Sequence, residues 1–164
     1  RIAEAVRARI PEAHFFLLGM GALRRQVEED LSQRLGRTAF TIRHAVVEMA
    51  DAYRAMDVSV LCSRREGSPN AVLESMAAGV PIVAANVGGV PELLETIAPE
   101  LLVDDRQPES FASRVARLLQ DGAARAAVGQ RLAARAEEYT VETMVARHRD
   151  LYYEALDGAT LEAR

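Results

Sequence analysis

Tryptophan is absent from this 164-residue sequence, and aromatic residues make up only 5% of it. Stacking platforms for nucleic-acid bases or sugar rings are therefore scarce. Cysteine is almost absent as well, because Cys62 is the single one. It cannot form a disulfide within the chain, a pattern typical of proteins in a reducing cytoplasm, so we expect a cytoplasmic location.

Long apolar runs and a surplus of positive charge are also lacking. No stretch reaches the roughly 18 consecutive apolar residues that indicate a membrane-spanning helix. The 20 basic and 24 acidic residues give a net charge of −4, which offers no general attraction for nucleic acid. We therefore expect no nucleic-acid partner. What is present, 49% hydrophobic and 27% charged residues, is ordinary for a globular domain.

The length fits one domain over residues 1–164. The chain begins at Arg1, without a methionine and already inside a helical pattern, so we expect its natural start to lie upstream. Because no strand precedes this first helix, we also expect at least one strand of the sheet to be encoded there. The sequence is thus interpreted as an N-terminally truncated domain.

Short apolar runs alternate with helical patterns along most of the chain. The expected strands are residues 14–18, 39–42, 58–62 and 81–85, with 101–103 as an edge strand. The expected helices are residues 2–10, 23–35, 49–56, 69–78, a short one from about 91, 108–120, 123–138 and 140–156. This alternation predicts an α/β fold with a doubly wound parallel sheet and a helical C-terminal tail. The first strand is expected to be buried on both faces.

Four loops are expected at the edge of the sheet where the strands end. They are residues 19–21, 43–45, 63–68 and 86–90. In open α/β sheets, ligands bind beyond the carboxyl ends of the strands, where such loops lead into helices. Three of the four loops contain glycine, which permits close approach of a ligand to the backbone. The sequence therefore predicts a binding site at this edge.

The third of these loops leads into a helix with features of an anion site. Ser68 is expected as its N-cap and Pro69 as its first residue, so free N–H groups and the positive end of the helix dipole would face a phosphate. Glu74 lies off the apolar stripe of this helix, and its carboxylate can accept both hydroxyls of a vicinal diol such as ribose. Glu66 lies eight positions earlier, in the loop itself. The two carboxylates could thus contact two parts of one elongated ligand.

The same stretch carries three linked motifs. Residues 66–84 read Glu-Gly-Ser-Pro-Asn-Ala-Val-Leu-Glu-Ser-Met-Ala-Ala-Gly-Val-Pro-Ile-Val-Ala, and residues 87–92 read Val-Gly-Gly-Val-Pro-Glu. The two glutamates eight apart, the helix end and the double-glycine loop closely resemble, in order and spacing, the signature of family-four retaining glycosyltransferases. Weaker matches extend the resemblance over nearly the whole chain. It implies the Rossmann-like C-terminal half of a GT-B glycosyltransferase.

The resemblance also implies an activity. Members bind a nucleotide-diphosphate sugar such as a UDP- or GDP-sugar and transfer a hexosyl group with retention, without a cofactor or a bound metal. The other half of such an enzyme binds the acceptor, so we expect a missing N-terminal acceptor domain as the partner of this one. The fragment alone is expected to be inactive, and peripheral association with a membrane through the missing half stays open.

Roles for individual residues follow from the resemblance alone. Glu66 would contact hydroxyls of the donor sugar as the catalytic position, either as nucleophile or as a positioning group, of which we favour the second. Glu74 would hold the ribose. The remaining donor-binding positions would act mainly through their backbone: Gly19, Gly21, Arg43, His44, Gly67, Ser68, Pro69, Asn70 and Ala71.

Some features leave alternatives open. Arg43 stands where many members have glycine, which puts the contact to the base in doubt, and the family's diphosphate-binding Arg and Lys would precede Arg1. Gly88 and Gly89 fit either a ligand contact or simple turn chemistry. A GT-B nucleotide-sugar epimerase or a non-catalytic binding module would share this fold. The identity of sugar, base and acceptor is not encoded in any motif found here.

Overall fold

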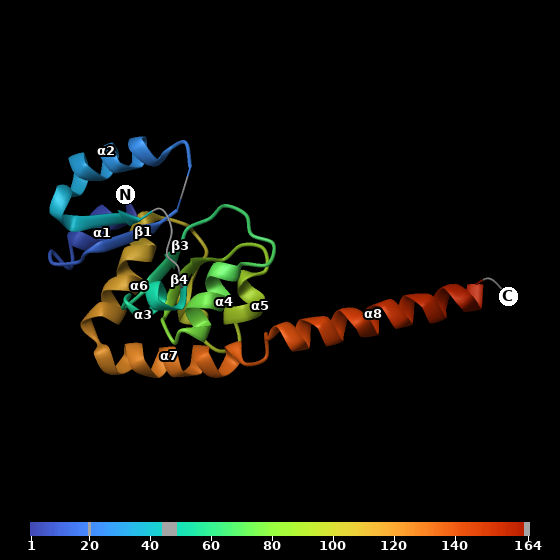
Figure 1. Ribbon diagram of the computed structural model, residues 1–164. Coiled ribbons are helices and arrows are strands. Elements are labelled where there is room, and N and C mark those ends of the chain that lie inside the picture. The colour runs from blue at the N-terminus through green and yellow to red at the C-terminus, as the bar shows by residue number, and fades with distance from the viewer. Residues whose placement is uncertain (20, 44–48, 163–164) are drawn as a thin grey trace.

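The computed structural model describes residues 1–19, 21–43 and 49–162 (Figure 1). The helices are α1 (Ile2–Arg7), α2 (Arg24–Leu35), α3 (Met49–Arg54), α4 (Asn70–Ala77), α5 (Val90–Leu94), α6 (Pro108–Gln120), α7 (Gly122–Ala136) and α8 (Val141–Glu162). The strands are β1 (Phe15–Leu18), β2 (Phe40–Arg43), β3 (Ser59–Leu61), β4 (Ile82–Ala85) and β5 (Leu102–Val103). Two short 3₁₀ helices, η1 (Arg37–Ala39) and η2 (Pro99–Leu101), lead into β2 and β5.

Every pair of neighbouring strands is parallel. β1 pairs with β2, with Phe15 opposite Phe40, and a second ladder has the order β3-β4-β5, with Ser59 opposite Ile82. A parallel pair needs a long crossover, which α2 supplies between β1 and β2, α4 between β3 and β4, and α5 between β4 and β5. The predicted α/β fold with a helical C-terminal segment is confirmed.

The sheet is interrupted, which the sequence pattern did not indicate. Among the described strands, β1 pairs only with β2 and β3 only with β4, so each of these two strands has one unpaired edge. The expected upstream strand would find unpaired N–H and C=O groups at these edges, and its existence stays a prediction. β1 is half-buried along its length, so the expectation that this strand is buried on both faces is wrong.

The core is built around β4. All four residues of this strand are buried, and Val83 and Ala84 are completely covered. Figure 1 shows β4 between α4 and α6, and both helices contact it. Phe111 of α6 is among the largest buried side chains. Because the helices cover both faces, a continuous apolar strand is the pattern expected at this place.

Two helices depart from the predicted core. α2 contains no buried residue; Val27 is 38% exposed, and Leu23, the N-cap residue before the helix, is 66% exposed. It contacts mainly α1, β2 and η1, so its apolar stripe has little to cover it. α8 extends away from the rest of the domain (Figure 1), and its large apolar side chains between Val141 and Leu156 are exposed. Neither helix contributes much to the burial that holds the domain together.

Candidate functional site

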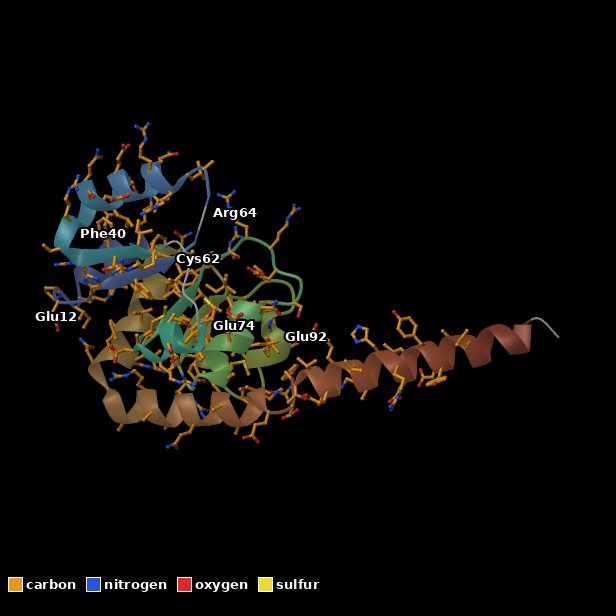
Figure 2. The ribbon with its side chains drawn as sticks, in the orientation of Figure 1. Glu12, Phe40, Cys62, Arg64, Glu74 and Glu92 are labelled. Carbon is orange, nitrogen blue, oxygen red and sulfur yellow. The ribbon has the colours of Figure 1, made fainter. Side chains whose placement is uncertain are left out.

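The carboxyl ends of β3 and β4 carry two loops that touch each other. The first, residues 62–69, follows β3 and leads into α4, and the second, residues 86–89, follows β4 and leads into α5. The backbone N–H of Gly89 donates to the carbonyl of Gly67 at 3.2 Å. Figure 2 shows Arg64 on the first loop and Glu74 on α4, the helix that follows it. The predicted edge of the sheet therefore does bring these two loops together.

The start of α4 differs by one residue from the prediction. Pro69, not Ser68, occupies the N-cap position, and no side chain caps the helix. Its ψ of 86° lies outside the helical range, and its carbonyl accepts from Val72 N at 2.9 Å and Leu73 N at 3.3 Å. Ser68 contributes its carbonyl, which accepts from Asn70 N at 3.0 Å. The expectation that Ser68 caps the helix is wrong, because its hydroxyl accepts no hydrogen bond from the first turn.

The missing side-chain cap leaves backbone donors available. Among the described residues, none accepts a hydrogen bond from the backbone N–H of Gly67, Ser68 or Ala71. Gly67 and Ser68 are exposed and Ala71 is half-buried. Free N–H groups at the positive end of a helix form a ready site for an anion such as a phosphate. The geometry at the start of α4 is thus suited to a phosphate ligand.

Glu74 has a partner that the sequence pattern did not reveal. Tyr53 of α3 is only 7% exposed, and its hydroxyl donates to the carbonyl of Ala71 at 3.2 Å, next to the Glu74 carboxylate. Burial, followed by the charge of Glu74 and a hydrogen bond to it, raises the pKa of Tyr53 to about 12. The neutral hydroxyl therefore remains a donor beside the exposed carboxylate of Glu74. From the sequence, Tyr53 was expected only to lie within the short helix of residues 49–56.

Three glycines at this edge are not explained by the protein's own packing. A Cβ atom at Gly19, Gly21 or Gly67 would meet no described atom within 4 Å. None of these three has a positive φ, because the described glycines with positive φ are Gly36, Gly79 and Gly88. Among the described residues, nothing therefore fills the space beside Gly19, Gly21 or Gly67. The open space beside them is where a ligand could approach the main chain.

The remaining predicted residues lie on the neighbouring pair of strands. Gly19 follows β1, and its N–H donates to the carbonyl of Arg43 at the end of β2, at 3.1 Å. The Arg43 side chain is exposed. His44 lies outside the described residues. The structure thus joins Gly19 to Arg43 and Gly67 to Gly89, and the part of the chain it describes shows no hydrogen bond between these two groups.

The part of the chain that the structure describes holds neither a metal-ligand cluster nor a membrane-spanning helix. Within the described ranges, no group of three or more His, Cys, Asp and Glu side chains comes together as a metal site. That no metal takes part in the activity stays a prediction. No helix in the described part of the chain is long and apolar enough to cross a bilayer.

The sequence matches one family model and a set of related proteins. The family model described as glycosyl transferases group 1 matches residues 1–121. A D-inositol 3-phosphate glycosyltransferase of Thermobispora bispora is 36% identical over 110 residues, which are 67% of this chain and 26% of that protein. A protein of the same name from Corynebacterium kroppenstedtii is 28% identical over 141 residues, 84% of this chain and 31% of that protein. The chain therefore spans about a quarter to a third of the length of these relatives.

Solved structures share the fold. A sucrose-phosphate synthase from Thermosynechococcus elongatus aligns with a TM-score of 0.82 and 25% identity, covering 96% of this chain and 42% of that one. The Anabaena protein HepE, solved in complex with UDP, aligns with a TM-score of 0.83 and 18% identity, covering 93% of this chain and 44% of that one. These alignments reach across almost all of the residues described above.

Proposed function

The chain belongs to the family of glycosyl transferases group 1, and on that premise we propose that it binds the donor of a retaining hexosyl transfer, a nucleoside-diphosphate sugar. The main support for this proposal is one feature of the site. The free N–H groups of Gly67, Ser68 and Ala71 lie at the start of α4, and the exposed Glu74 lies on the same helix. This arrangement offers donors for a diphosphate and an acceptor for a sugar diol on one element.

The diphosphate would bind at the start of α4. Its negative charge increases when the bond between the sugar and the diphosphate breaks, because the leaving group departs as an anion. Backbone N–H groups that are already oriented stabilise such developing charge without rearrangement. Gly67 supports this role, since the space where a side chain would stand is empty of described atoms. A ligand oxygen could therefore reach the main chain of this loop.

The ribose would bind at Glu74. A carboxylate accepts hydrogen bonds only, so it suits the two hydroxyls of ribose. The Tyr53 hydroxyl lies beside it, where it is buried and donates to the carbonyl of Ala71. Glu74 lies three residues after Ala71, the last of the three donors, or ~4.5 Å along the helix axis, which suits a ribose attached to a diphosphate.

Glu66 would contact the transferred sugar. In the transfer, the bond from the sugar C1 to the diphosphate oxygen breaks, and a bond from C1 to an acceptor hydroxyl oxygen forms on the same face. The proton of the acceptor hydroxyl leaves with the diphosphate or passes to solvent. We propose that Glu66 positions the sugar rather than attacking it. No metal is proposed for this step, in which the leaving charge falls to the backbone donors.

The acceptor would come from outside this chain. Its relatives are three to four times longer than the stretch they share with it, which supports a further domain that binds the acceptor. We propose that transfer needs both domains, since closing a cleft between them excludes water from the reacting bond. On this proposal residues 1–164 bind a nucleotide and transfer nothing by themselves, and the complete protein works in the cytoplasm.

A titration tests the proposal directly. The ¹⁵N-labelled chain is titrated with UDP, GDP and ADP while its amide resonances are recorded. At least one nucleotide is expected to shift resonances between Glu66 and Ala78, with weak affinity. The same titration with the matching nucleoside, which lacks the diphosphate, should leave the amides of Gly67, Ser68 and Ala71 in place. The proposal is wrong if none of the three nucleotides shifts this segment.

A further inference from the structure

We propose that Gly88 and Gly89 are positioning residues that hold the main chain of Glu66 and Gly67 in place for the donor sugar. This inference rests on the proposed function, because Glu66 matters only if it contacts that sugar. It concerns the loop after β4, for which ligand contact and turn chemistry were both open. The geometry assigns it a third role, which is contact with the neighbouring loop.

Two independent features call for glycine at position 88. Its φ is +55°, a left-handed backbone conformation that side chains rarely adopt. A Cβ atom at this position would also lie 1.7 Å from the carbonyl oxygen of Glu66 and 2.7 Å from its carbonyl carbon. Atoms cannot approach so closely, so any side chain at position 88 would displace the Glu66 main chain. The contact involves backbone on both sides and has no flexible side chain that could yield.

Gly89 makes the equivalent contact one residue further on. A Cβ atom here would lie 2.4 Å from the carbonyl oxygen of Gly67, and the Gly89 N–H donates to that same oxygen at 3.2 Å. Its φ of −78° is open to any residue, so only the close approach calls for glycine. Consecutive residues of one loop therefore fit against consecutive residues of the other.

A side chain at position 88 or 89 would displace the loop of the candidate site rather than the hydrophobic core. The first loop carries Glu66 and the free N–H groups of Gly67 and Ser68, and the second loop holds it on the side where Gly88 and Gly89 lie. On its other side Gly67 faces open space, with no described atom within 4 Å of a Cβ. Gly88 and Gly89 thus support the loop on one side, and its other side is open to a ligand among the described residues. Displacing it would move Glu66 while leaving Glu74, which lies on the body of α4, in place.

This separation predicts a split in ligand affinity. Isothermal titration calorimetry compares the nucleoside diphosphate that binds the unmodified chain (UDP, GDP or ADP) with its glucose conjugate (UDP-glucose, GDP-glucose or ADP-glucose). Gly88→Ala and Gly89→Ala are expected to lower the affinity for the conjugate relative to the nucleotide by about tenfold. The affinity for the nucleotide itself should also fall, because the displaced loop carries the Gly67 and Ser68 donors for the diphosphate, but it should fall less than the affinity for the conjugate, which loses its contact with Glu66 as well. Gly89→Ala avoids the left-handed backbone and serves if Gly88→Ala fails to fold.

Gly129→Ala is the matched control. A Cβ atom at Gly129 would lie 2.2 Å from the carbonyl oxygen of Gly79, a backbone collision of the same kind at the opposite end of α4. It should lower the melting temperature without changing the affinity ratio. An unchanged ratio in Gly88→Ala and Gly89→Ala, or an equal change in Gly129→Ala, would overturn the positioning role.

A second measurement needs no ligand. The amide resonances of Glu66, Gly67 and Ser68 should move in Gly89→Ala and stay in place in Gly129→Ala. If they do not move, the positioning role is wrong whatever the chain binds. If they move while no nucleotide binds the unmodified chain, the positioning of the loop stands and the proposed function fails.

Discussion

The hydroxyl oxygens of Ser59 and Ser75 lie 2.6 Å apart in the interior, where both residues are buried. Ser75 donates to the carbonyl of Val80 at 2.8 Å, so its single proton is used there and Ser59 must be the donor between the two hydroxyls. This chain of hydrogen bonds runs from β3 through α4 to the segment before β4. It fixes α4, and with it the start of that helix, against the strand that leads into the site.

Ser75→Ala is expected to destabilise the fold. The substitution removes two hydrogen bonds and leaves the Val80 carbonyl and the Ser59 hydroxyl without their partner, at a cost of about 1–3 kcal/mol. Ser59→Ala removes one bond and leaves Ser75 bonded to Val80, so it should cost less, about 1 kcal/mol. Urea unfolding measures both free energies. Equal and small effects, below about 0.5 kcal/mol, would contradict the assigned direction of donation.

Tyr53→Phe should change how the free energy of unfolding depends on pH between about 10 and 12. Folding raises the pKa of Tyr53 from 10.0 to about 12, so between these values the unfolded chain loses a proton that the folded chain keeps. The contribution of this group to stability is therefore present below pH 10 and is lost as the pH rises toward 12, by at most roughly 3 kcal/mol. The stability of the unmodified chain should fall more steeply than that of Tyr53→Phe across this interval. Parallel curves from pH 9 to 12 would show that Tyr53 keeps its ordinary pKa.

Glu74→Gln should weaken recognition of the ribose. Each nucleotide is offered in its ribose form and in its 2′-deoxy form, for example UDP and dUDP. The unmodified chain is expected to prefer the ribose form by about 1–3 kcal/mol, and Glu74→Gln to lose most of this preference. Glu92→Gln is the control, because Glu92 is an exposed glutamate on the neighbouring helix α5 (Figure 2). A preference that survives in Glu74→Gln places the ribose elsewhere.

Gly67→Ala should separate stability from binding. No described atom lies within 4 Å of the added Cβ, and the backbone is not left-handed, so the melting temperature should stay within the change expected for about 0.5 kcal/mol. The methyl group would occupy the space proposed for the diphosphate and sugar, and should lower nucleotide affinity about tenfold. Calorimetry and thermal unfolding report the two effects separately. Unchanged affinity would mean that the ligand does not approach this loop.

The sequence predicted the elements well where local signals were strong. α6 begins at Pro108 and ends at Gln120 as expected, since proline favours the first turn and Phe111, Val115 and Leu118 fall on one buried face. The buried run of β4 was equally clear. The loop motifs located the edge of the sheet where the predicted site residues gather, although their roles remain predictions.

Contacts between segments distant in the sequence could not be predicted in this way. Nothing in the sequence around Tyr53 points to Glu74, because the two meet only when α3 packs on α4. Gly88 packs against Glu66, which lies 22 positions earlier in another loop. The contact is made by backbone atoms, so no pattern of side chains in the sequence indicates it. The shift of the helix cap from Ser68 to Pro69 depends on one backbone angle. Propensity describes such boundaries only to within about one or two residues.

The contact at Gly88 is made with the carbonyl group of Glu66, and every amino acid has that group. The position of this loop is therefore independent of the side chain at position 66. A library that varies residue 66 and keeps the two glycines would present many different side chains from the same place in space. On the proposed function, position 66 is accordingly the point at which directed evolution could change sugar preference at little cost in folding, whereas a side chain at position 88 or 89 would displace the loop.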